Sequence, residues 1–138
     1  MTSLIAALVL SIASEVGVPP FFALSVALEE NCSLNPNALN KNPNGTFDGG
    51  VMQLNSSWFT GDWEDPESNI RAGCLLIKEL MGKPEITTFW DVAIAYQCGY
   101  TRFLERPPSQ TIEYACRVYA RWHLFEGPYF QAGALKKQ

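Results

Sequence analysis

The sequence predicts an α+β fold that is mostly helical and carries one small, irregular sheet. Apolar residues recur at helical spacing in five stretches, and prolines, glycines and capping residues stand at the ends of these stretches. Between residues 35 and 55 the pattern changes to Asn, Pro, Gly and Asp separated by short apolar pairs, which is typical of turns and hairpins. The 138 residues contain no repeat or linker, so we expect one domain over residues 1–138.

The first expected helix covers residues 4–16. Its apolar residues recur at helical spacing on one face: Leu4, Ile5, Leu8, Val9, Ile12 and Val16. The stretch from Leu4 to Ile12 also has the length of a signal-peptide core, but no Lys or Arg precedes it to form the positive region of such a signal. We therefore favour a helix of the folded domain, and a signal peptide is the alternative.

The next two expected helices have prolines at their starts. Pro19 and Pro20 suit the first turn of a helix, where a missing N–H costs little, and this helix runs to about Asn31. Asp65 is a capping residue in front of a helix over residues 66–81. The apolar face of that helix consists of Ile70, Cys74, Ile77 and Met81.

Two more helices complete the expected fold. Thr88 can cap a helix that runs through Gln97 and is apolar on nearly every side, so we expect this helix at the centre of the molecule. Pro108 precedes a last helix from Ser109 to about Leu124. The inward face of the last helix is expected to include Ile112, Cys116 and Tyr119.

Composition excludes several classes of function. Ten basic and fourteen acidic residues give a formal charge of −4, so a phosphate-binding surface and a nucleic-acid partner are not expected. No apolar stretch reaches the roughly 18 residues that span a bilayer, because Glu15 and the two prolines interrupt the first one. The spacing of Cys32, Cys74, Cys98 and Cys116 does not indicate zinc, and we expect no metal or cofactor. The sequence leaves open whether these four cysteines are free thiols or form two disulfides.

The second helix ends on a glutamate that faces the expected core. Phe22, Val26 and Glu30 lie four residues apart, whereas Glu29 falls on a more polar face. A carboxylate in the last turn also meets the negative end of the helix dipole. Partial burial would raise the pKa of Glu30 and keep it protonated near neutral pH, as a general acid requires. We expect Glu30 to be this acid; an ordinary solvated helix-end glutamate is the alternative.

Several motifs occur in a fixed order around and after Glu30. The helix that ends at Glu30 is followed by Asn-Pro-Asn-Ala at residues 35–38 and by Gly-Val-Met-Gln at residues 50–53. Further on come Ala-Tyr-Gln-Cys-Gly at residues 95–99 and Ser-Gln-Thr-Ile-Glu-Tyr at residues 109–114. In this order the motifs resemble the soluble-type lytic transglycosylases, which implies a lysozyme-like fold with the small sheet beside the active-site cleft.

The hairpin segment at residues 44–59 resembles the secretion-associated branch of these transglycosylases and is also similar to animal-type lysozymes. The resemblance implies that Asp48 matches the second catalytic carboxylate of the lysozymes, while an ordinary turn residue is its alternative role. It also implies that the counterparts of six residues bind the sugar or support the acid: Gln53, Asn55, Trp58, Tyr96, Gln97 and Tyr114. The counterpart of Tyr96 hydrogen-bonds the acid in the family, although Tyr96 and Tyr114 are also plausible core aromatics.

The resemblance implies cleavage of the MurNAc–GlcNAc β-1,4 bond of peptidoglycan with Glu30 as the single acid and base, which gives a 1,6-anhydroMurNAc product. One alternative is a muramidase that hydrolyses the bond with Glu30 and Asp48. Another is a non-catalytic peptidoglycan-binding assembly component, because Gln97 and Gln110 replace an Asn and a Glu of the family. The implied partner is the glycan strand in the periplasm or at the cell wall, and a secretion-apparatus partner remains open.

Overall fold

The computed structural model describes residues 2–131 and 134–135 and confirms the mostly helical α+β prediction. The helices are α1 (Thr2–Val16), α2 (Pro20–Glu30), α3 (Pro66–Met81), α4 (Phe89–Cys98), α5 (Tyr100–Glu105) and α6 (Ser109–Glu126), followed by a 3-10 turn η1 (Gly127–Tyr129). The strands are β1 (Leu39–Lys41), β2 (Phe47–Gly49) and β3 (Leu54–Asn55). None of the helices in the described part of the chain combines the length and the apolar character needed to cross a membrane.

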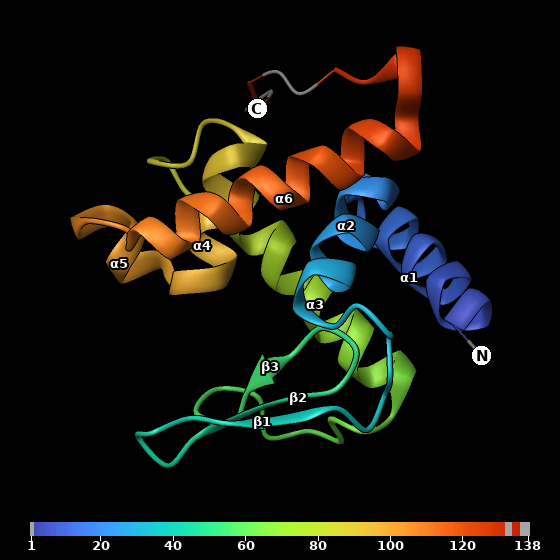
Figure 1. The fold of residues 1–138 in the computed structure, drawn as a ribbon, viewed down its shortest axis with the longest axis vertical. Helices are drawn as coiled ribbons and strands as arrows, with labels where there is room; N and C mark the ends of the chain where they lie inside the picture. The colour runs from blue at the N-terminus through green and yellow to red at the C-terminus, as the bar shows by residue number, and fades with distance from the viewer. Residues whose placement is uncertain (1, 132–133, 136–138) are drawn as a thin grey trace.

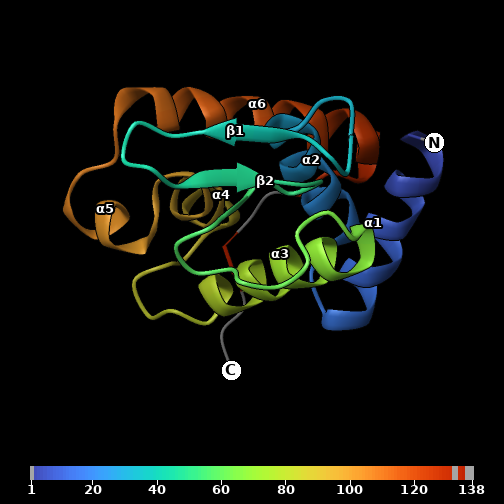
Figure 2. The ribbon, with the colours of Figure 1, turned by 90° about the horizontal axis from the view of Figure 1, so that it is seen from below.

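The helices form one body, and the sheet lies at one end of it. Helix α2 packs against α1 and α6, while α4 packs against α3, α5 and α6. Figures 1 and 2 show the three strands beyond the C-terminal end of α2, beside α3, with α6 running across the other helices. The end of α2, which carries Glu30, therefore lies between the helical body and the sheet.

Helix α1 belongs to the core of the fold. Its residues Ile5, Val9 and Ile12 are buried where α1 packs against α2 and α3, whereas Leu4 is exposed. The preference for a helix of the folded domain over a signal-peptide core agrees with this packing.

The starts of two helices follow the predicted caps. Asp65 accepts a hydrogen bond from the backbone N–H of Ser68 at 2.9 Å and so caps α3. Thr88 accepts from the N–H of Asp91 at 3.1 Å, and the Asp91 carboxylate accepts from the N–H of Thr88 at 3.2 Å. These bonds satisfy N–H groups that a helix start leaves without partners, so the beginnings of α3 and α4 are fixed locally.

The sheet brings polar side chains from separate strands onto one face. Its order is β1-β2-β3, with antiparallel pairing throughout. Asn40 on β1 pairs with Asp48 on β2, and Asp48 pairs with Asn55 on β3. Because directly paired residues project to the same side of a sheet, these three side chains share one face.

Asn69 holds the end of the sheet against α3. This residue is fully buried, and its side-chain oxygen accepts from the N–H of Met52 at 2.8 Å. Its amide nitrogen donates to the carbonyls of Gly49 at 2.9 Å and Trp63 at 3.1 Å. One buried amide therefore supplies hydrogen-bond partners to three backbone groups, two near the sheet and one in the loop before α3.

The prediction of which face of the last helix points inward was wrong. Its bounds agree with α6, but Ile112 is 37% exposed and Cys116 is exposed, while Tyr119 is half-buried. The buried face consists of Thr111, Tyr114, Ala115, Val118 and Trp122. The apolar residues of this face pack against α2 and α4, and the hydroxyls of Thr111 and Tyr114 find partners there, so the helix is rotated relative to the predicted face.

The sequence did not predict α5, and it left the state of the cysteines open. Gly99 has a φ of 88° and turns the chain between α4 and α5, a conformation that suits glycine. All four cysteines lie in the described part of the chain and are free thiols, of which only Cys74 is buried. The buried-thiol interpretation therefore applies to Cys74 and not to Cys116.

Candidate active site

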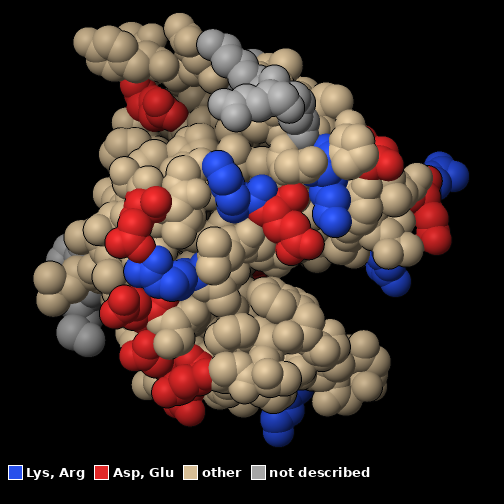
Figure 3. Space-filling model, turned by 180° about the vertical axis from the view of Figure 1, so that it is seen from behind, with Lys and Arg blue, Asp and Glu red and all other residues tan. Residues whose placement is uncertain are grey.

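A cleft of about 760 Å³ separates the sheet from the helices α4, α5 and α6. Figure 3 shows it as a gap between the lower lobe and the larger body above. Glu30 lies in it, together with polar residues of the sheet side and of the helical side. The sheet side contributes Asn42, Thr46, Asp48, Gln53, Asn55 and Trp58, and the helical side contributes Tyr96, Gln97, Arg102, Gln110 and Thr111.

Glu30 lies in an environment that raises the pKa of a carboxyl group. It is partly buried at the end of α2, and its Oε2 accepts a hydrogen bond from the Tyr114 hydroxyl at 2.7 Å. Burial raises the pKa of Glu30 from 4.5 to about 7; the Tyr114 hydrogen bond opposes this rise, while the negative charges of Asp48 and Glu29 add to it. Near neutral pH the protonated and ionised forms are therefore both populated.

The neighbouring Glu29 lies in a different environment, as the sequence predicted. Its Oε2 accepts from Nε of Arg117 at 2.6 Å, and its Oε1 lies 3.6 Å from Nε of Arg121. Both arginines are on α6, so these two ion pairs join the end of α2 to α6, and Glu30 is the carboxyl group of α2 that faces the cleft.

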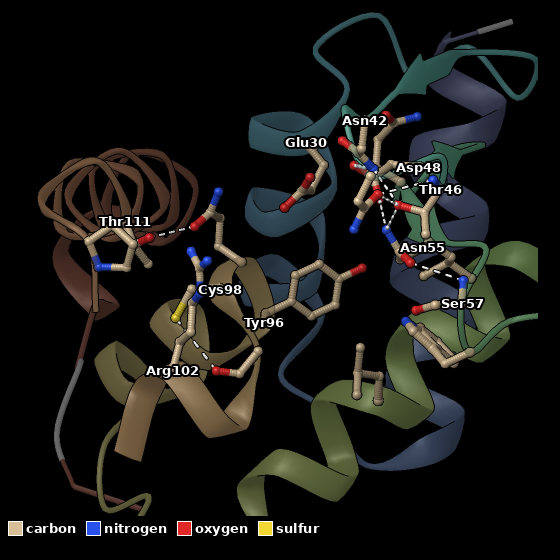
Figure 4. Close-up of a pocket in the computed structure, with 18 of the residues that line it drawn as sticks. Glu30, Asn42, Thr46, Asp48, Asn55, Ser57, Tyr96, Cys98, Arg102 and Thr111 are labelled. Atoms are coloured by element: carbon tan, nitrogen blue, oxygen red, sulfur yellow. Dashed lines mark hydrogen bonds between the residues drawn. The ribbon is translucent and has the colours of Figure 1, made fainter. Parts of the chain in front are cut away.

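Asp48 lies in the same cleft and is held by two amides. Its Oδ1 accepts from Nδ2 of Asn55 at 2.9 Å, and its Oδ2 accepts from Nδ2 of Asn42 at 3.3 Å. Asn55 and Asn42 also donate to Thr46 Oγ1, at 3.2 and 3.1 Å. Figure 4 shows this group of polar side chains on the sheet side of the cavity, with Glu30 beside it. The bonds fix the orientation of the Asp48 carboxylate.

Gln53 joins backbone segments within the sheet region. Its Nε2 donates to the carbonyls of Gly50 at 2.9 Å and Ala38 at 3.2 Å, and its Oε1 accepts from Nδ2 of Asn40 at 2.6 Å. Both N–H groups of the side chain are therefore used within the protein. Gln53 also has a φ of 52°, a value that non-glycine residues seldom adopt. Gln53 therefore lines the cleft, and its side-chain bonds hold the cleft wall together.

The two tyrosines differ from the arrangement that the resemblance implied. Tyr96 donates to the carbonyl of Met52 at 2.8 Å, and it is Tyr114 that donates to Glu30. Tyr114 is buried behind Glu30 and is not among the residues that line the cleft, whereas Tyr96 is. Burial, and next the charge of Glu30, raise the pKa of both hydroxyls well above the ordinary value, so both remain hydrogen-bond donors.

Trp58 and Gln97 stand on opposite sides of the cleft with groups that remain available to a ligand. Trp58 is 48% exposed and forms a T-shaped ring contact with Phe59. Gln97 accepts from the hydroxyl of Thr111 at 2.6 Å through Oε1, which orients its amide. An exposed aromatic ring and an oriented amide suit the apolar face and the hydroxyl groups of a sugar.

Sequence reasoning missed part of the site. Asn42, Thr46, Thr111 and Arg102 all line the cleft and were not predicted to do so. The signal for Asn42 and Thr46 was their position in the turn before Asp48, where the backbone N–H of Asn42 bonds to the carbonyl of Thr46. Among the described residues no group of three His, Cys, Asp or Glu side chains could hold a metal ion.

A family model for the transglycosylase SLT domain matches residues 8–111. The matched range contains Glu30, Asp48 and the whole sheet, and it ends three residues before Tyr114. No curated protein sequence matches the chain. Because the model covers well over half of the 138 residues, the chain belongs to the transglycosylase SLT domain family, lysozyme-like domains whose general activity is lytic transglycosylation of peptidoglycan.

Proposed function

We propose that this protein is a lytic transglycosylase that cleaves the MurNAc–GlcNAc β-1,4 bond of peptidoglycan with Glu30 as its single acid and base. The observation that carries the proposal is the partly buried Glu30 carboxyl in the cleft, whose pKa burial raises to about 7. A group with this pKa gives up and accepts a proton with similar ease near neutral pH, as a residue with both roles must.

The proposed reaction has two proton transfers through Glu30. Protonated Glu30 gives its proton to the glycosidic oxygen as the bond from that oxygen to C1 of MurNAc breaks. The resulting carboxylate then takes the proton of the C6 hydroxyl of the same MurNAc, whose oxygen bonds to C1. The products are a glycan end with a free hydroxyl and a 1,6-anhydroMurNAc end, and Glu30 is protonated again. No water molecule is consumed.

The other site residues have supporting roles in this proposal. Tyr114 positions Glu30, and Gln53 and Tyr96 hold the backbone of the cleft wall through the carbonyls of Gly50 and Met52. The substrate is contacted by Trp58, Asn55 and Gln97. We also propose that residues 1–138 form one domain and that it acts where peptidoglycan is present, in the periplasm or at the cell wall.

Mass spectrometry of digested peptidoglycan tests the proposed product. We expect muropeptides that end in 1,6-anhydroMurNAc. Products heavier by one water would instead identify a hydrolase, and an absence of cleavage with retained pull-down of peptidoglycan would identify a binding protein.

Hydrolysis is a second candidate because Asp48 is oriented by Asn42 and Asn55 in the same cleft. A retaining hydrolase needs such a carboxylate to stabilise or capture the positively charged sugar. We expect Asp48→Asn to keep activity within about tenfold, since the transglycosylase reaction uses only Glu30. A loss of about 10³-fold, measured as kcat/KM on soluble glycan strands, would favour the hydrolase.

Removal of the Tyr114 hydroxyl is expected to change the pH profile. The hydrogen bond from Tyr114 lowers the pKa of Glu30, so Tyr114→Phe raises it further. Glu30 then stays protonated to higher pH, and the alkaline limb of kcat/KM moves upward in pH, while kcat/KM itself falls about tenfold. A pH series for both proteins measures this; Tyr119→Phe, on the same helix, should leave the profile in place.

A further inference from the structure

Arg102 is the basic residue of the cleft. Among the described residues that line the cavity, it alone is a Lys or Arg. It lies on α5, which follows the turn at Gly99, and Gly99 and Arg102 both line the cleft. Figure 4 shows the Arg102 side chain near Cys98, across the cavity from Asp48 and Asn55. The cleft therefore has two carboxyl groups in one part and a cation in another.

The guanidinium of Arg102 has no ion-pair partner in the described part of the chain. Three other arginines do: Arg71 pairs with Glu15 and Glu67, and Arg117 and Arg121 pair with Glu29. The charge of Arg102 is thus available to a ligand in the cleft. Arg106, on the same part of the chain, is suitable as a control residue. It also has no ion-pair partner among the described residues, but it does not line the cleft.

A chain of neutral sugars offers no group that needs such a cation. MurNAc differs from GlcNAc by a 3-O-lactyl arm, which ends in a carboxylate or continues into a peptide that carries carboxylates. Guanidinium and carboxylate groups match in charge and geometry and can form two parallel hydrogen bonds. We propose that Arg102 binds a carboxylate on the lactyl arm of MurNAc, and this inference rests on the proposed function.

The proposal assigns a role in substrate choice to α5. The oriented amide of Gln97 and the side chain of Gln110 line the same side of the cleft and can bind uncharged groups of the arm. Arg102 then separates acidic glycans, which contain MurNAc, from neutral ones such as chitin, because only the former offer a carboxylate. In this proposal Arg102 contributes to substrate binding and takes no part in proton transfer.

Calorimetry with the full chain carrying Glu30→Gln, which prevents turnover, tests this role. Three tetrasaccharides serve as ligands: chitotetraose, a GlcNAc–MurNAc repeat without peptides, and the same repeat with its stem peptides. We expect Arg102→Gln to weaken the binding of at least one MurNAc ligand about tenfold more than that of chitotetraose. Arg102→Lys should recover part of the loss, and Arg106→Gln should cause none.

The outcomes show which carboxylate Arg102 binds, and they distinguish a failure of the Arg102 proposal from a failure of the proposed function. A selective loss only with the peptide-free MurNAc ligand identifies the lactyl carboxylate, because the stem peptide converts that carboxyl group into an amide. A loss only with the peptide-bearing ligand identifies a carboxylate of the peptide, and a loss with both shows that Arg102 binds either one. Equal changes for all three ligands would overturn the role of Arg102. Cleavage of whole peptidoglycan by the unmodified protein is measured in parallel, so a failure of the proposed function is recognised separately.

Discussion

Glu30→Gln is expected to lower kcat on peptidoglycan by about 10³-fold or more. Gln has nearly the same shape as Glu and can still accept the hydrogen bond from Tyr114, but it cannot give a proton to the glycosidic oxygen. The loss should therefore appear in kcat, with little change in the affinity for glycan strands. Release of soluble muropeptides measures kcat, and Glu113→Gln, an exposed change on α6, is the control. Retention of most activity in Glu30→Gln would end the single-acid mechanism.

The stability of Glu30→Gln as a function of pH shows whether the fold of this variant is intact. The pKa of Glu30 is about 7 in the folded protein and 4.5 in the reference state, so the folded protein binds more protons between these values. Its stability therefore falls as the pH rises from about 4.5 to 7. Glu30→Gln lacks this loss, and we expect it to be more stable than the unmodified protein at pH 8, by at most about 3 kcal/mol. Denaturant unfolding at pH 4 and pH 8 measures the difference, which should vanish at pH 4.

Gly50→Ala is expected to reduce the free energy of unfolding by about 4 kcal/mol. Gly50 has a φ of 81°, which costs an alanine about 1 kcal/mol, and a Cβ there would overlap the side-chain amide of Asn69 and the carbonyl of Trp63. Asn69 cannot move without losing its bonds to the backbone of Met52 and Gly49. The substitution therefore breaks the contact between the sheet and α3, and denaturant unfolding measures the loss.

Gly45→Ala is the matched control for this substitution. Gly45 also has a positive φ, of 88°, but a Cβ there would have no described atom within 4 Å. Only the conformational cost remains, so we expect a loss of about 1 kcal/mol. Similar losses for the two variants would show that the close contacts around Gly50 do not stabilise the fold.

The sequence predicted those features that depend on neighbouring residues. The caps at Asp65 and Thr88 gave the starts of α3 and α4, because a cap bonds to residues only three positions away. The four-residue spacing of Phe22, Val26 and Glu30 gave the direction of the Glu30 side chain, because the face of a helix follows from its period alone. The fold class and the family followed from the same local signals.

Features that depend on distant residues were not predictable in this way. Tyr114 and Glu30 are 84 positions apart, and no local rule marks Tyr114 as the donor to Glu30. The buried face of α6 depends likewise on distant partners, namely packing on α2 and α4 and the bonds of Tyr114 and Thr111, which spacing within α6 does not reveal. The three bonds of the Gln53 amide depend on the return of the chain from β1, which spacing does not reveal. Arg102 was missed because α5 is short and has no buried residue to mark a face.

The proposed chemistry depends most directly on the protonation state of one side chain. A ¹³C NMR titration of the glutamate carboxyl groups, with Glu30→Gln used to assign the resonance of Glu30, measures that state. We expect the Glu30 carboxyl to titrate with an apparent pKa of about 7, because burial disfavours its charged form. A carboxyl that titrates near 4.5 would be fully ionised at neutral pH, and it would contradict the role of Glu30 as the proton donor.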